Sequence, residues 1–432
     1  MKKKGGKKKG KKMAPERVVV TTRFIEAERL RCMCPRLGDA YARSEAVLDV
    51  RADVVFCRLK KVAQYGLETL DASGGRLGFL PEEIRERPEM ACLTNLNLSR
   101  NQLFNSDHVF GILLGLKNLK KLDLTDNFFN GVLSAAAGRL RELEELRLDV
   151  NQITELPAAV DMWTELRVFS ISHNALTVLP PQASGHWRNL EDLNVRNNDL
   201  RMLPLEMGRW AKLRRLLAGG NGILEVPAEV GECSELEVLD LRGNALSELP
   251  PELARCTSLA LLHVGGNKIS EFGPEMCEAF VNLQELYLYR NKITSLPPEV
   301  VGCMARLVKL SLSGNNIKAK PRPTYLYTQA IPAEIGACSG LAELYINNNQ
   351  KFSSVPTSIS GLKMLRELSA RRCKALKSLP SELAKCENLK ELDVRSDKKQ
   401  TCKMTPEFAA ALKVRRCNIR GGVIKKGKGK KA

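Results

Sequence analysis

The sequence predicts an α/β solenoid, a curved stack of short parallel strands with turns and short helices on its outer side. The first observation is a motif of the form L-x-x-L-x-L-x-x-N, which recurs every 23 or 24 residues through most of the chain. The second is the size of one copy, which is too small to bury its own apolar side, so that neighbouring copies must stack. The third is the alternation of Leu239 and Leu241 with polar residues, as in a strand with one buried face.

Each part of the repeated motif has a physical role. The Asn that follows the strand is expected to turn the chain, because its amide can satisfy backbone groups that a buried turn leaves unpaired. The later Leu-Pro, as at Leu249-Pro250, starts the return along the outer side, since Pro removes a donor and fixes φ. The Asn position can be followed through Asn101, Asn127, Asn151, Asn174, Asn198, Asn221, Asn244, Asn267, Asn291, Asn315 and Asn349. Gly75 precedes this series and Cys373 and Asp397 follow it, which gives about 14 copies over residues 67–397.

This repeat resembles the leucine-rich repeat family, in its intracellular form with an L-P-x-x-[IVL] second half. The resemblance covers most of the chain and implies a curved solenoid with a parallel inner sheet. It is more specific for fold than for function.

The ends of the chain differ from the repeats. Residues 1–14 form a Lys/Gly tail that is expected to be disordered, and residues 15–66 are expected to form an N-terminal helical cap. Residues 398–418 are expected to hold a C-terminal cap helix that begins at Thr405-Pro406-Glu407, before a second disordered basic tail at 419–432.

The net charge of +19 lies mainly in these tails. The tail lysines that we expect to contact a polyanion are Lys2, Lys3, Lys4, Lys7, Lys8, Lys9, Lys425, Lys426, Lys428, Lys430 and Lys431. The folded part is nearly neutral. The N-terminal charges are not followed by an apolar run, so a signal peptide is not expected, and no apolar stretch is long enough for a membrane span. These features favour a cytoplasmic protein.

Cysteine and tryptophan share one periodic position. Cys233, Cys256, Cys338 and Cys386 each lie three residues before the first Leu of a copy, and so do Trp163, Trp187 and Trp210. We expect both residue types to pack in the outer layer, in preference to forming disulfides, metal sites or a ligand box. This cysteine usage fits a reducing compartment. Cys32-x-Cys34 has no partners at zinc spacing and is not expected to bind metal.

One copy is longer than the others. The interval from Asn315 to Asn349 contains an insertion at 318–329. Insertions in a solenoid emerge from one face, which is often the binding face. Its candidate contact residues are Lys320, Arg322, Tyr325 and Tyr327, and the alternative is a tolerated surface loop.

The repeat also identifies the side chains that line the concave sheet. The later copies place basic and aromatic residues there, and Tyr and Arg are the residue types that dominate interface energy. We expect residues 285–372 to form the main docking site, for a partner of acidic or mixed character; the alternative is an ordinary solvated sheet face. The candidate protein-binding residues are Arg242, Tyr287, Tyr289, Arg290, Tyr345, Arg371 and Arg372.

Nothing in the sequence indicates catalysis. It contains neither a phosphate-binding G-x-x-x-x-G-K-[ST] loop nor an H-E-x-x-H motif. We therefore expect no enzyme activity, no catalytic residue, no cofactor and no metal.

Three function classes remain. The first is a structural scaffold in a larger assembly. Lys/Gly-rich ends on a repeat protein look like those of ciliary or flagellar axoneme proteins, where tubulin in microtubules offers an acidic polymer. The second is a signalling adaptor, because the repeats are similar to the Ras-group intracellular family, which binds small GTPases and phosphatases. The third, nucleic-acid binding, is disfavoured because neither tail contains an aromatic residue for base stacking.

Overall fold

The computed structural model describes residues 66–86, 88–318, 320–321, 327–328, 331–396 and 402–424. The cap expected at 15–66 lies outside these ranges except for its last residue, and so do the tail lysines and the loop residues Arg322 and Tyr325.

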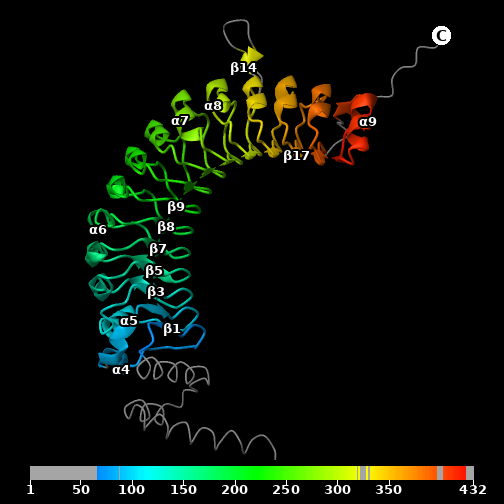
Figure 1. Cartoon of the computed structure of the whole chain (residues 1–432). Coiled ribbons are helices and arrows are strands. Elements are labelled where there is room, and N and C mark those ends of the chain that lie inside the picture. Colours follow the sequence, from blue (N-terminus) through cyan, green and yellow to red (C-terminus); the bar gives the residue numbers. More distant parts are fainter. Residues whose placement is uncertain are drawn as a thin grey trace, which may run out of the picture.

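Within the described residues, fifteen strands form one sheet, and every neighbouring pair in it is parallel. Figure 1 shows an arc with this sheet on the inner, concave side and short helices on the outer side. The predicted solenoid is confirmed. The strands are β1 (Thr69–Asp71), β2 (Asn95–Asn97), β3 (Lys121–Asp123), β5 (Glu145–Arg147), β7 (Val168–Ser170), β8 (Asp192–Asn194), β9 (Arg215–Leu217), β10 (Val238–Asp240), β11 (Leu261–His263), β12 (Glu285–Tyr287), β13 (Lys309–Ser311), β16 (Glu343–Tyr345), β17 (Glu367–Ser369), β18 (Glu391–Asp393) and β20 (Asn418–Arg420).

Among the described residues, the outer layer consists mainly of single turns of helix, nine of which begin directly after a Pro that follows Leu, Val or Ile. Pro suits this place because its fixed φ fits a helix start and its missing N–H is not needed there. The α-helices of this layer are α4 (Glu83–Glu86), α5 (Ser106–Leu113), α6 (Pro181–Ser184), α7 (Cys277–Phe280) and α8 (Pro298–Gly302). The 3₁₀ turns are η1 (Pro88–Cys92), η2 (Ala135–Arg139), η3 (Ala158–Met162), η4 (Leu205–Arg209), η5 (Ala228–Glu232), η6 (Pro251–Arg255), η7 (Pro274–Met276), η8 (Ala333–Ala337), η9 (Thr357–Gly361) and η10 (Ser381–Lys385).

The repeated asparagines fix neighbouring repeats to one another. The Nδ2 group of Asn267 donates to the carbonyls of Leu241 and Val264, both at 2.9 Å, and its Oδ1 accepts from the N–H of Leu246 at 3.1 Å. The asparagine therefore satisfies backbone groups of two repeats at once, as the sequence predicts. Cys373 replaces this asparagine near the end, and its thiol donates to the Ile346 carbonyl at 3.2 Å.

The tryptophans and cysteines of the outer layer have one common function. Trp187 is fully buried, stacks on Trp163 and Trp210, and donates its indole N–H to the Val160 carbonyl at 2.9 Å. Cys256 lies at the same position of a later repeat and donates its thiol to the Val230 carbonyl at 3.3 Å. Both residue types thus bind a carbonyl of the preceding repeat, and the packing interpretation is confirmed for these positions.

The C-terminal end contains more regular structure than expected. The helix α9 (Pro406–Val414) begins at Thr405, whose hydroxyl accepts from the Phe408 N–H. Beyond it, β20 adds to the main sheet and β21 (Val423–Ile424) pairs with β19 (Lys403–Met404). The sheet therefore extends past the boundary expected at 397. In the segments that lead from the main sheet to the outer turns, β4 (Asn130–Val132) pairs with β6 (Gln152–Glu155).

Candidate functional site on the concave surface

The parallel register places one residue of each repeat beside the equivalent residue of the next. Asp240 lies beside His263, which lies beside Tyr287, because β10, β11 and β12 pair without a shift. Tyr345 continues the same column on β16, next to Ser311 of β13. The columns read from the sequence are therefore the columns of the structure.

Asp240 is the centre of a polar cluster that extends over five repeats, from the repeat of β8 to the repeat of β12. Its carboxylate is 1% exposed and accepts a hydrogen bond from the Arg196 guanidinium and another, at 3.0 Å, from the Arg242 N–H. The Arg242 Nε lies 3.6 Å away and the His263 Nδ1 3.7 Å away. On its other side, His263 places Nε2 3.1 Å from the Tyr289 hydroxyl. We call Arg196, Asp240, Arg242, His263 and Tyr289 the central cluster.

Two glycines make the central cluster possible. A Cβ at Gly219, on the repeat between Arg196 and Asp240, would lie 2.8 Å from the Arg242 Cγ. A Cβ at Gly265 would lie 2.6 Å from the Tyr289 ring. Because neither glycine has a side chain, Arg196 can reach across to Asp240 and the Tyr289 ring can lie across the sheet.

A second network surrounds the other two tyrosines. The Tyr287 hydroxyl donates to Glu285 at 2.6 Å. The Tyr345 hydroxyl lies 3.0 Å from a Glu343 oxygen and 2.9 Å from a Glu367 oxygen, and donates to one of them at a time. The Lys309 ammonium bonds Glu343 at 2.8 Å and lies 5.6 and 5.7 Å from the centres of the Tyr287 and Tyr345 rings. These residues, Glu285, Tyr287, Lys309, Glu343, Tyr345 and Glu367, form the tyrosine network.

Burial and hydrogen bonds in both networks change the pKa of side chains within them. Burial lowers the pKa of His263, although Asp240 opposes this effect. Burial and a hydrogen bond to Glu367 raise the pKa of Tyr345, and burial and a hydrogen bond to Glu285 raise that of Tyr287. Each shift favours the neutral side chain, so the rings and their hydroxyls stay uncharged at neutral pH. The surface thus presents hydrogen-bonding groups, aromatic rings and fixed charges.

The structure places some of the predicted protein-binding residues away from the concave tyrosines. Arg290 and Arg372 have positive φ values of 51° and 56° and lie at the bend after their strands, at the edge of the sheet. Arg371 stays on the concave side, with its Nε 3.6 Å from Asp393. Within the insertion, β14 (Lys320–Pro321) pairs with β15 (Tyr327–Thr328), and β14 lies on the outer side of the arc (Figure 1). These two strands therefore do not join the concave tyrosines in one surface, because they follow the bend that leads the chain outward.

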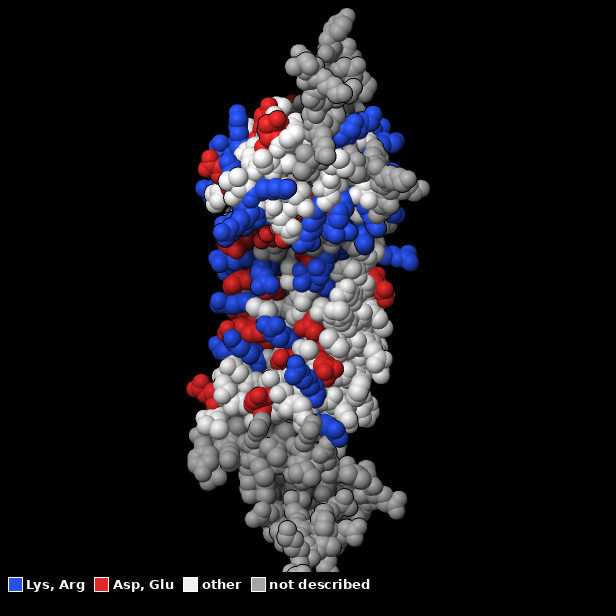
Figure 2. Space-filling view, turned by 90° about the vertical axis from the view of Figure 1, so that its right-hand side faces the viewer, with Lys and Arg blue, Asp and Glu red and all other residues white. Residues whose placement is uncertain are grey.

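The N-terminal half of the concave surface is largely neutralised by its own ion pairs. Lys120 pairs with Glu144 at 2.8 Å, Lys121 with Glu145 at 3.5 Å, and Arg215 with Asp192 at 3.4 Å. Figure 2 shows the result as alternating red and blue side chains along one side of this surface. Asp149, which gives the early repeats an acidic character in the sequence, accepts from the Ser170 hydroxyl and the Ser172 N–H. The C-terminal half therefore remains the better candidate for docking.

Sequence reasoning missed Arg196, Lys309 and the glutamates of the tyrosine network. A signal for the glutamates exists, because Glu285, Glu343 and Glu367 occupy the first position of their strands. Their pairing with tyrosine depends on side-chain rotamers, which the repeat pattern does not encode.

The described residues contain neither a metal-binding cluster nor a membrane-spanning helix. No group of three or more His, Cys, Asp or Glu side chains among them is placed to hold a metal ion. None of the helices in this part of the chain has the length and apolar character needed to cross a membrane.

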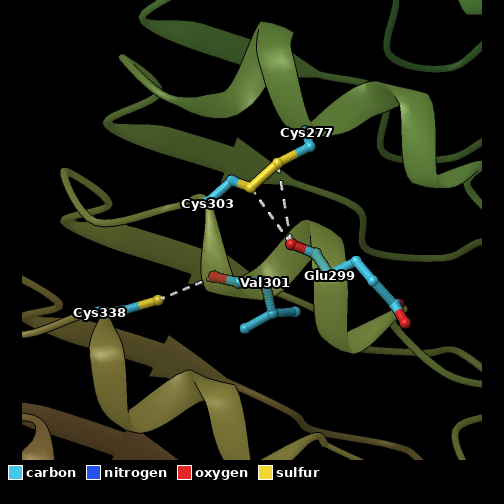
Figure 3. The surroundings of a disulfide bond; sticks show 5 residues. All are labelled: Cys277, Glu299, Val301, Cys303 and Cys338. Carbon is cyan, nitrogen blue, oxygen red and sulfur yellow. Dashed lines mark hydrogen bonds between the residues drawn. A yellow bond between two sulfur atoms is a disulfide. The ribbon is translucent and has the colours of Figure 1, made fainter.

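The outer layer contains a disulfide that differs from the expectation of free thiols. Cys277 at the start of α7 is bonded to Cys303 after α8, with 5.6 Å between their Cα atoms, a separation typical of disulfides. Figure 3 shows both sulfur atoms beside the Glu299 carbonyl, with Cys338 and Val301 forming a separate contact. Neither cysteine occupies the periodic position, where burial raises the pKa of Cys256 and of Cys338 to about 11. The pattern that identifies the periodic thiols therefore does not reveal this pair.

Comparison with known proteins supports the fold. Models of the leucine rich repeat match residues 141–200, 164–223, 257–317 and 235–256. A probable serine/threonine-protein kinase, pats1 of Dictyostelium discoideum, is 32% identical over 31% of this chain, and the match covers 4% of that protein. The oligodendrocyte-myelin glycoprotein of Homo sapiens is 30% identical over 33% of this chain, with 31% of its own length matched. The chain thus spans less than a third of either relative.

Solved structures extend the similarity to most of the chain. A leucine-rich repeat protein of Leptospira interrogans is 27% identical, with a TM-score of 0.61, and the match covers 84% of this chain and 98% of that one. An internalin of Listeria monocytogenes is 17% identical, with a TM-score of 0.62, over 88% of this chain and 100% of that one. The second likeness bears on fold alone.

Proposed function

Because the chain is a leucine-rich repeat protein, we propose that it is a non-enzymatic scaffold that binds another protein on its concave surface. The docking site in this proposal comprises the central cluster and the tyrosine network. Rigid repeats hold such a surface in one shape before a partner arrives, which lowers the conformational cost of binding.

The observation that carries this proposal is the fixed arrangement of Tyr287, Tyr289 and Tyr345. Each phenol is held by a neighbour on the protein, so binding would immobilise little additional side-chain motion. Each ring is still partly exposed and can contact a partner. Tyrosines that are both oriented and accessible are typical of the energetic centres of interfaces.

The test replaces Tyr287, Tyr289 and Tyr345 by Ala in the tagged chain and measures which proteins co-purify from its own cells. We expect partners to be lost while the variant keeps its circular dichroism spectrum. A companion variant with three Phe substitutions keeps the rings and should retain most of the binding. Unchanged partner binding by the Ala variant would refute the proposal.

We propose further that the assembly is cytoskeletal, in a cilium or flagellum axoneme, where the basic tails contact acidic tubulin tails on microtubules. The tail lysines support this extension through their charge alone. The inserted loop, with Lys320, Arg322, Tyr325 and Tyr327, would then be a separate contact on the outer side. Deletion of residues 1–12 and 425–432, which leaves β20 and β21 in place, should abolish co-sedimentation with microtubules. Equal binding of the intact chain to microtubules stripped of their acidic tails would contradict the proposal.

A cytoplasmic signalling adaptor is the second candidate. It is favoured by the relatives, since three of them are named as serine/threonine-protein kinases, one of these as probably inactive. An adaptor for a small GTPase should retain that GTPase in one nucleotide state only, and should do so without its tails. A phosphatase partner would instead bind independently of nucleotide.

A further inference from the structure

The net charge of one edge of the solenoid changes from negative to positive along the chain. The edge consists of the segments that lead from the concave strands to the outer turns, beginning one residue before the repeated Asn. In the later repeats these segments are 290–297, 314–318, 348–356 and 372–380, and together they hold seven Lys or Arg residues and no Asp or Glu. The seven cations are Arg290, Lys292, Lys318, Lys351, Arg372, Lys374 and Lys377, and we call them the basic edge.

The equivalent segments of the seven preceding repeats have the opposite balance. Segments 126–133, 150–157, 173–180, 197–204, 220–227, 243–250 and 266–274 hold six Asp or Glu residues and two Lys or Arg. The repeat itself therefore does not require cations at this edge. Figure 2 shows Lys and Arg side chains gathered over the upper, C-terminal part of the molecule and few charges on its lower right flank.

Backbone hydrogen bonds hold the later segments side by side. The Lys318 N–H donates to the Thr294 carbonyl at 2.9 Å, and the Ile317 N–H donates to the Asn349 side chain at 3.2 Å. The Ala375 N–H in turn donates to the Gln350 carbonyl at 3.3 Å. The seven cations thus form one continuous strip across four repeats.

Four lysines of the strip are available to a partner. Lys292, Lys351, Lys374 and Lys377 are exposed, and within the described ranges none of them has a carboxylate within ion-pair distance. Polar side chains lie between them, among them Asn348, Gln350, Ser353 and Ser354, all exposed. Three strand steps of about 4.8 Å give a length of about 15 Å, which five residues of extended chain would span at about 3.3 Å each.

We propose that the basic edge binds an extended acidic polypeptide segment of another protein. Carboxylates of the peptide pair with the exposed lysines, and its backbone hydrogen-bonds the interleaved amides and hydroxyls. This surface is distinct from the concave tyrosines, so the chain has a second site that selects partners by charge.

Other polyanions fit the edge less well. The four segments contain one aromatic residue, Phe352, and it is fully buried, so no ring is presented for stacking nucleic-acid bases. Their exposed side chains are polar or charged, so nothing is presented for insertion among lipid tails. The remaining occupant would be the acidic part of the same edge on a second copy.

The experiment reverses three charges within the basic edge in one variant and three charges outside it in another. The test variant is K351E/K374E/K377E, and the matched control is K363E/K385E/K390E, which changes three exposed lysines outside the basic edge by the same net charge. Binding of a fluorescein-labelled ten-residue polyglutamate peptide to the full chain is measured by fluorescence anisotropy at about 50 mM salt, where surface charges are weakly screened. Carbodiimide cross-linking and mass spectrometry then map the lysines that contact the peptide.

We expect the test variant to bind at least tenfold more weakly than the control, with cross-links at Lys351, Lys374 or Lys377 in the unmodified chain. The triple Tyr→Ala variant should bind the peptide normally, which separates this inference from the concave docking site. Equal weakening in both lysine variants, or cross-links confined to the terminal tails, would overturn the proposal. Equal dependence of polyuridylate RNA or phosphatidylserine vesicles on these lysines would also overturn it, as would edge-dependent self-association without peptide binding.

Discussion

Replacement of Asp240 by Asn measures how firmly the concave surface is arranged before a partner binds. The carboxylate is 1% exposed and lies among Arg196, Arg242 and His263. Asparagine has nearly the same shape, and its carbonyl oxygen can still accept from the Arg242 N–H. The substitution removes the negative charge and turns an amide N–H₂ group toward a cation.

The expected loss of stability follows from these contacts. A hydrogen bond to a charged group contributes about 1.5–3 kcal/mol, and loss of a partner from a buried ion pair costs about 3–5 kcal/mol. Arg196 is 29% exposed and can turn partly toward water, which reduces the cost. We expect D240N to lower the free energy of unfolding by about 2 kcal/mol.

Asp393 provides a matched control, since it occupies the same position on its strand and also precedes an arginine by two residues. Its carboxylate is 11% exposed and bonds Arg395 at 2.6 Å, but the Arg395 side chain is 47% exposed. We expect D393N to cost about 1 kcal/mol or less.

Urea unfolding followed by circular dichroism measures both effects. A double-mutant cycle with R196Q should give a coupling of about 1–2 kcal/mol between Arg196 and Asp240. A coupling below about 0.3 kcal/mol, or equal losses for D240N and D393N, would refute the reasoning, because the cross-strand bond would then contribute nothing.

Three further predictions concern the free energy of unfolding. The pKa of His263 in the folded chain lies below its ordinary value of 6.5. The stability that neutral His263 contributes should therefore be fully present above pH 6.5 and should fall as the pH drops through the folded pKa. H263Q should weaken this pH dependence in urea titrations between about pH 7.5 and 5. Removal of the Cys277–Cys303 disulfide in C277S/C303S should cost about 3 kcal/mol by loop entropy, and a stability equal to wild type would contradict this. W187A should cost about 3–5 kcal/mol in the same assay, and W187F, which keeps a ring but loses the bond to the Val160 carbonyl, should cost clearly less.

The sequence predicts the fold and the surface columns because both depend on periodicity. Leu239 and Leu241 are buried and Asp240 faces the concave side, as alternation along a strand requires. A fixed period carries this information from one repeat to the next. The same regularity gives the common position of Trp187 and Cys256.

The contacts within the site could not be predicted in the same way. That Arg196 reaches Asp240 depends on the glycine between them, and that Lys309 lies near two tyrosine rings depends on its rotamer. The position of β14 on the outer side and the pairing of Cys277 with Cys303 depend on geometry between repeats. These features follow from the three-dimensional arrangement of the repeats, which the sequence period does not specify.

The central claim is that a partner protein lies on the concave surface, and site-specific cross-linking tests it most directly. A photoreactive benzoyl-phenylalanine is placed either at Ser313, between the tyrosines on the concave side, or at the exposed Glu334 of η8 on the outer side. After irradiation in the protein's own cells, we expect the Ser313 position to capture a defined partner that the Glu334 position does not capture. Capture from Glu334 alone would contradict the account.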